Sequence, residues 1–96
     1  DVHIVVAMGT SGIAAGAKVV LNTIADELEK AGCDDVILTQ CGSEDGYPEP
    51  FVEVYSKEKG LTAYGAVSKS DAVRIVREHI LKGNILSDKA VQVKEE

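Results

Sequence analysis

The 96 residues of the chain are enough for one domain with a two-layer core, and they exclude a second domain. Sixteen acidic side chains against ten basic ones give a net charge of -6, which argues against nucleic acid and against an anionic membrane surface as partners. No apolar run approaches the roughly 18 residues of a membrane-spanning helix, so we expect no membrane insertion.

The first half of the chain predicts a strand, a helix and a second strand. Residues 2–7 form a β-branched apolar run broken only by His3, which is typical of a central strand covered on both faces. Residues 36–38 predict a second strand, parallel to the first because a helical crossover joins them. Between the strands, apolar residues recur at helical spacing, and Gly32 suits the position after the helix. The expected inward stripe is Ile13, Ala17, Val20, Leu21, Ile24, Leu28 and Ala31, and the expected outer faces carry Asn22, Asp26, Glu27, Glu29 and Lys30.

The second half predicts a hairpin and a helix. Residues 41–50 form an acidic loop, and residues 51–55 and 61–66 predict antiparallel strands joined by a polar turn. A second helix is expected from Ser68 or Ser70 to Gly83, with Asp71 at capping-box spacing from Ser68. Its expected inward residues are Val73, Val76, Ile80 and Ala72.

The resulting order is β-α-β followed by β-β-α, with residues 84–96 as a C-terminal tail of one domain, 1–96. This order predicts an α/β, thioredoxin-like fold with a mixed four-stranded sheet and helices packed on it. A ferredoxin-like β-α-β-β-α-β order stays open if residues 90–93 form another strand.

Three segments resemble the thioredoxin-like [2Fe-2S] ferredoxin family: residues 5–17 (VVAMGTSGIAAGA), residues 39–43 (TQCGS) and Glu49-Pro50. Domains of this family occur in NADH-quinone oxidoreductases and NAD(P)-linked iron-only hydrogenases. The resemblance implies the thioredoxin-like fold, a cytoplasmic location, and flavin and iron-sulfur subunits as partners. It also implies that the chain is an oxidoreductase subunit that is not catalytic alone.

The family's cluster ligands are a cysteine pair five residues apart in the first loop and a pair four apart in the second. The corresponding positions here are Ala7, Gly12, Ser43 and Tyr47, or Ser11 in place of Gly12 where relatives carry the first-loop cysteine one residue earlier. Ala7 and Gly12 have no ligating atoms. We therefore expect no cofactor in this chain, although the fold is that of a cluster-binding domain.

The two cysteines cannot replace the missing ligands. Cys33 and Cys41 bracket the second strand, and eight extended residues separate them by about 26 Å, too far for a shared metal ion or a disulfide. His3 and His79 lie in other elements, so no zinc spacing and no metal site is expected. Cys33 is interpreted as a core or near-surface residue. Cys41 is either a reactive thiol or an ordinary loop residue.

Two loops have alternative interpretations. Gly9, Thr10, Ser11 and Gly12 could bind an anion at the start of the first helix, or the glycines could simply permit a tight turn. The acidic side chains of Glu44, Asp45, Glu49 and Glu53 are either a solvated loop or a rim that attracts a basic partner, and nothing in the sequence buries them.

Three functions follow from these observations. The preferred hypothesis is a ferredoxin-like structural or docking subunit without its own cluster. The alternatives are a [2Fe-2S] electron-transfer protein and a thiol redox activity at Cys41.

Overall fold

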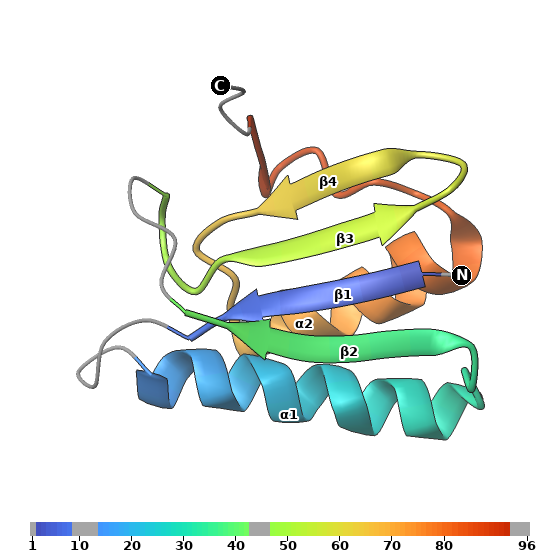
Figure 1. Cartoon of the computed structure of the whole chain (residues 1–96), viewed down its shortest axis with the longest axis horizontal. Helices are drawn as coiled ribbons and strands as arrows, with labels where there is room; N and C mark the ends of the chain where they lie inside the picture. Colours follow the sequence, from blue (N-terminus) through green and yellow to red (C-terminus); the bar gives the residue numbers. More distant parts are fainter. Residues whose placement is uncertain (1, 9–13, 43–46, 93–96) are drawn as a thin grey trace.

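A mixed five-stranded sheet forms one layer of the computed structural model, which describes residues 2–8, 14–42 and 47–92. The strand order is β2-β1-β3-β4-β5, with β1 parallel to β2 and every other neighbouring pair antiparallel (Figure 1). The strands are β1 (Val2–Ala7), β2 (Val36–Cys41), β3 (Val52–Ser56), β4 (Gly60–Tyr64) and β5 (Ala90–Val91). The helices are α1 (Ala14–Ala31), α2 (Lys69–Arg74) and the π-helix η1 (Ile75–Ile80). The parallel pair β1–β2 and the antiparallel hairpin β3–β4 are confirmed, as is the mixed sheet of the predicted thioredoxin-like fold.

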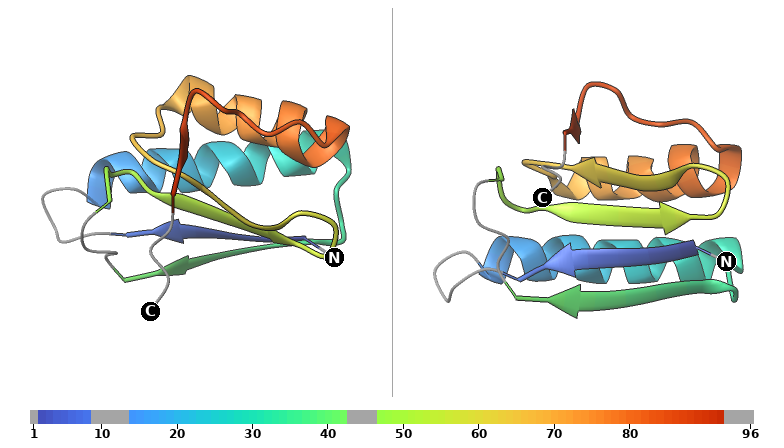
Figure 2. Two further views of the ribbon diagram at one scale, coloured as in Figure 1. Left: turned by 90° about the horizontal axis from the view of Figure 1, so that it is seen from above. Right: turned by 45° about the horizontal axis from the view of Figure 1, so that its top comes forward.

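Helices α1, α2 and η1 form one layer on a single face of the sheet (Figure 2). Ile4 and Val6 of β1 are fully buried in the core against the helices. His3 and Val5 point to the opposite face and are only half-buried. The prediction that β1 is covered on both faces is therefore wrong at these two positions. No helix in the described part of the chain packs against that face of the sheet.

Helix α1 contacts the core through the predicted stripe. Ala17, Val20, Ile24 and Leu28 are buried, whereas Ala31 at the end of the helix is exposed. Gly32 has a φ of 69°, so the left-handed residue after the helix is confirmed. Glu27, predicted on an outer face, is only 8% exposed. It is covered because η1 packs beside α1 and places Arg77 against it.

The second helix begins as predicted but changes its winding. Ser68 is the N-cap of α2, and its capping box with Asp71 is confirmed. At Ile75 the α-helix gives way to η1, which sequence periodicity did not predict. Ala72, Ile75 and Val76 are fully buried, while Val73, predicted to face inward, is half-buried. The buried residues Ala72, Ile75, Val76 and His79 still recur at spacings of three and four, so the error at Val73 is one of phase along the helix and is not caused by the π-helical winding.

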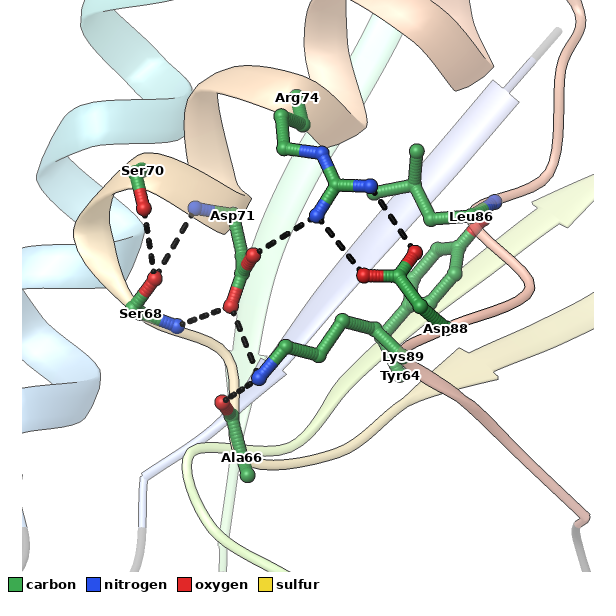
Figure 3. A network of polar contacts seen from close by, with 9 residues as sticks. All are labelled: Tyr64, Ala66, Ser68, Ser70, Asp71, Arg74, Leu86, Asp88 and Lys89. Atoms are coloured by element: carbon green, nitrogen blue, oxygen red, sulfur yellow. Dashed lines mark hydrogen bonds and ion pairs between the residues drawn. The ribbon is translucent and has the colours of Figure 1, made fainter.

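The tail contains a fifth strand, which the four-stranded prediction lacks. β5 pairs antiparallel with β4 and extends the sheet at its edge, without altering the thioredoxin-like core order. Side chains fasten this segment to α2 (Figure 3): Arg74 bonds both Asp71 and Asp88, and Lys89 bonds Asp71 and the carbonyl oxygen of Ala66. The segment after Gly83 is thereby held against the domain.

Candidate functional site

The carboxyl ends of β1 and β2 lie side by side. Ala7 is opposite Cys41 in the parallel register, and the Met8 N–H donates to the Cys41 carbonyl oxygen at 2.9 Å. β2 therefore continues three residues beyond its predicted end, and Cys41 is the last residue of a strand instead of the first of a loop. Pairing with β1 extends the strand through the polar Thr39 and Gln40.

A small second hydrophobic cluster forms at this end of the sheet. Ala7, Phe51 and Ala63 are buried in it, and Cys41, Tyr47 and Val91 pack against it half-buried. The rings of Tyr47 and Phe51 stack with centroids 4.5 Å apart and planes 12° apart. The Ala7 N–H donates to the Phe51 carbonyl oxygen at 2.9 Å.

Ala7 and Tyr47 are two of the positions that correspond to the iron-sulfur ligands of the family. Both lie in this second hydrophobic cluster. Gly12, Ser11 and Ser43 lie outside the described residues. The candidate anion loop of Gly9, Thr10, Ser11 and Gly12 also lies outside them, as do Glu44 and Asp45. Sequence reasoning did not assign a part in this site to Phe51, whose position at the start of a strand gave no signal of it.

The two thiols lie in different parts of the core. Cys33 packs against the main core and Cys41 against the second cluster, and both are free cysteines. The Cys41 thiol donates to the carbonyl oxygen of Gly42, with sulfur and oxygen 3.2 Å apart. The placement of Cys33 is as predicted, and the expected separation of the two cysteines is confirmed.

The segment 47–50 joins this cluster to the end of β4. The carbonyl oxygens of Pro48 and Pro50 accept hydrogen bonds from the N–H groups of Ala66 and Val67, at 3.2 and 3.0 Å. Between the prolines, Oε1 of Glu49 is buried without a hydrogen-bond partner. The expectation that nothing buries the acidic group is therefore wrong for Glu49. A buried acceptor without a donor lowers the stability of the folded chain, so this oxygen is an exception among the buried polar atoms that the structure describes.

Cysteine and histidine side chains are few at this place. A [2Fe-2S] cluster takes four protein ligands, usually thiolates. The whole sequence holds two cysteines and two histidines, and of these only Cys41 lies at the carboxyl ends of β1 and β2. Within residues 2–8, 14–42 and 47–92, no group of three or more His, Cys, Asp or Glu side chains could hold a metal ion.

The helix-free face of the sheet carries a row of exposed side chains. His3 is opposite Ile37 on β2 and Tyr55 on β3, and Tyr55 is opposite Leu61 on β4. Ile37, Tyr55 and Leu61 are 61%, 41% and 40% exposed. His3 Nε2 lies 2.8 Å from the hydroxyl oxygen of Thr39 in the same face. Sequence reasoning missed this surface because it expected β1 to be covered on both sides.

No helix in the described part of the chain is long and apolar enough to cross a membrane.

Known proteins resemble this chain in fold and, in one case described here, in sequence. No protein-family model matches the chain. The chain is 34% identical over 84 residues to the NADP-reducing hydrogenase subunit HndB of Solidesulfovibrio fructosivorans, an alignment that covers 81% of this chain and 63% of that protein.

Solved structures match over nearly the whole chain. The wild-type thioredoxin-like [2Fe-2S] ferredoxin of Aquifex aeolicus superposes with a TM-score of 0.81 at 20% identity, covering 96% of this chain and 97% of the ferredoxin. A cysteine-to-serine variant of that ferredoxin gives a TM-score of 0.83 at 21% identity, covering 97% of this chain and 100% of the variant. The chain therefore has the thioredoxin-like fold of this ferredoxin, and its sequence is similar to that of a hydrogenase subunit.

Proposed function

We propose that this chain is a ferredoxin-like subunit of an NAD(P)-linked hydrogenase-type complex, that it holds no cluster of its own, and that it serves to dock other subunits. The sequence similarity to HndB and the ferredoxin fold support the assignment to such a complex. The partners in this proposal are the flavin and iron-sulfur subunits, in the cytoplasm. The chain has no catalytic activity alone.

The absence of a cluster is proposed because only one thiol lies where the family's ligands would be. Cys41 lies at the carboxyl ends of β1 and β2, whereas Cys33 packs against the main core. At the same place, Ala7 offers a methyl group, and Tyr47 stacks on Phe51. One thiol is three short of the usual ligand set.

The docking part is supported by the exposed row of Ile37, Tyr55 and Leu61. Large apolar side chains that lie in one row across three strands form a surface suited to a protein partner. His3 and Thr39 add polar groups to the same face, as is usual at the rim of an interface. We assign this face to another subunit of the complex, because the similar protein is itself a hydrogenase subunit.

Anaerobic reconstitution with iron and sulfide tests the cluster-free part. We expect no stoichiometric iron and no visible charge-transfer absorbance after desalting, in the wild type and in Cys41→Ser alike. About two irons per chain with absorbance near 400 nm, lost in Cys41→Ser, would establish the runner-up function of [2Fe-2S] electron transfer.

Co-purification tests the docking part. Ile37→Asp places a charge in the exposed row, so we expect it to reduce recovery of the flavin and iron-sulfur subunits. The matched control is Leu81→Asp, because Leu81 is 52% exposed but follows η1 in the helical layer. Equal recovery with the two variants would contradict the use of this face.

The third candidate function is thiol redox activity at Cys41. Its support is the position of the thiol at the carboxyl end of β2, where it is half-buried. Alkylation rates measured as a function of pH test it, with Cys33→Ser used to isolate the Cys41 signal. A rate like that of an ordinary thiol excludes this activity.

A further inference from the structure

A cavity of about 340 Å³ lies at the other end of the sheet from the candidate site. The turn between β3 and β4, the start of β1 and the end of η1 meet there (Figure 1). Its polar lining comes from Ser56, Lys57, Glu58, Lys59 and His79. Neither the ferredoxin-like fold nor the proposed docking function requires this cavity.

His79 lines the cavity although it is only 5% exposed. Its Nδ1 lies 2.6 Å from the hydroxyl oxygen of Tyr64, which is fully buried. That oxygen already accepts the Leu86 N–H at 3.1 Å. The Tyr64 hydroxyl hydrogen therefore donates to Nδ1, because the reverse arrangement would leave it without an acceptor in the core.

This bond fixes the state of the other ring nitrogen. With Nδ1 as acceptor, the neutral imidazole carries its hydrogen on Nε2. Burial first, and the nearby Lys59 ammonium second, lower the pKa of His79 and keep the ring neutral. Nε2 makes no hydrogen bond with any residue that the structure describes. Among the described residues it is a donor without a protein acceptor, in a side chain that lines the cavity.

The other groups around the cavity favour an anion. The Ser56 hydroxyl oxygen accepts the Lys59 N–H at 3.1 Å, so its hydrogen is available to donate. Lys59 lines the cavity beside His79, and its positive charge acts on the imidazole ring. A metal ion does not suit the cavity, since Nε2 carries hydrogen and has no lone pair to offer.

We propose that this cavity binds a small oxyanion, the carboxylate or phosphate group of a small molecule, through the Nε2–H of His79 and the charge of Lys59. The oxyanion supplies the acceptor that Nε2 lacks. The Tyr64 hydroxyl and the Leu86 N–H hold the imidazole in the orientation for donation.

Titration of the chain with sodium phosphate and, separately, with sodium acetate tests the proposal, with ionic strength held constant by sodium chloride. The readout is the ¹⁵N and ¹H shifts of the histidine rings. The chain has two histidines, so His3 on the sheet face is an internal control. We expect a saturable shift at His79 Nε2 with either or both anions and no saturable shift at His3. The anion that saturates identifies the class of ligand.

The variant Lys59→Gln should weaken the binding roughly fivefold, because it removes one charge beside the oxyanion. Lys18→Gln is the control, since Lys18 is exposed on α1 and does not line the cavity. Both substituted side chains are exposed, so both variants should fold. The absence of saturation with both anions overturns the proposal, as does equal binding by wild type and Lys59→Gln.

Discussion

Arg77 Nε donates a hydrogen bond to Oε1 of Glu27 at 3.0 Å, which joins η1 to α1 across fifty positions of sequence. The Glu27 side chain is almost covered, whereas Arg77 is largely exposed. The pair is therefore intermediate in burial. A surface ion pair contributes little to the free energy of unfolding, whereas removing one partner of a buried pair lowers it strongly.

We predict a coupling energy of about 1 kcal/mol between Glu27 and Arg77, measured by urea unfolding of Glu27→Ala, Arg77→Ala and the double variant. Lys30 also approaches Glu27, at 3.7 Å, but its side chain is 65% exposed. Lys30→Ala should therefore cost less than about 0.5 kcal/mol. A coupling energy near zero would mean that the contact with Arg77 does not contribute to the stability of the folded chain.

The N-cap of α2 gives a second prediction. The Ser68 hydroxyl oxygen accepts the Asp71 N–H at 3.1 Å, and Asp71 Oδ2 accepts the Ser68 N–H at 3.0 Å. Ser68→Ala removes the first of these bonds and should lower the free energy of unfolding by about 1 kcal/mol. Lys69→Ala, an exposed position in the same first turn but outside the capping box, should cost less than about 0.5 kcal/mol. Similar losses for both would argue against a specific cap.

Acidification should weaken the polar contacts of Asp71 with Ser68, Arg74 and Lys89, which Figure 3 shows. Burial alone raises the pKa of Asp71, but hydrogen bonds from Ser68 and Lys89 outweigh it and hold the pKa below its ordinary value. A lowered carboxyl pKa stabilises the folded chain above the unfolded pKa, and this contribution is lost as pH falls through the folded pKa.

The difference in unfolding free energy between wild type and Asp71→Asn should therefore be full at pH 7 and should shrink below about pH 4. Chemical denaturation at pH 7 and pH 3 measures it. The pKa of Asp88 is also lowered, by Arg74, but the Asp88 side chain is 57% exposed. Asp88→Asn should show a smaller difference, and a pH-independent effect of Asp71→Asn would exclude this linkage.

Gly65 lies where the segment 47–50 meets β5, and a side chain there has little room. A Cβ at this position would lie 3.0 Å from Cγ1 of Val91 and 3.3 Å from two atoms of Pro48. Gly65→Ala should cost about 1–3 kcal/mol by displacing these neighbours. Gly42→Ala should change stability by less than about 0.5 kcal/mol, because a Cβ there meets no atom within 4 Å.

Adding Val91→Ala to Gly65→Ala tests the cause of the loss. The second substitution removes the closest clashing methyl group, so the double variant should lose less stability than the sum of the two single variants. Strict additivity, measured by thermal or urea unfolding, would place the strain at Pro48 instead.

The element order was predictable because the local signals agree with the tertiary structure. The stripe from Ala17 to Leu28 is buried, and the Ser68 capping box forms where its spacing indicated. Local patterns could not show that β1 is uncovered beside His3, because coverage of a strand depends on where distant helices pack. Glu27 was misassigned for the same reason, since its cover comes from a helix fifty residues later.

The sequence named two residues of the hydrophobic cluster at the candidate site but could not describe how they pack. The family resemblance assigned Ala7 and Tyr47 to one site, and they do pack in one cluster. The stacking of Tyr47 on Phe51 and the partnerless oxygen of Glu49 depend on the path of the segment 47–50, which no periodicity describes. His79 gave no signal because its partner Tyr64 is on a strand fifteen residues earlier.

The π-helical winding of η1 accommodates one residue more than an α-helical turn of the same direction. Deleting one residue between Ile75 and His79 and rewinding that turn as an α-helix would therefore keep the imidazole directed toward the Tyr64 hydroxyl. Homologous chains that lack this residue would be expected to retain both the histidine and the tyrosine.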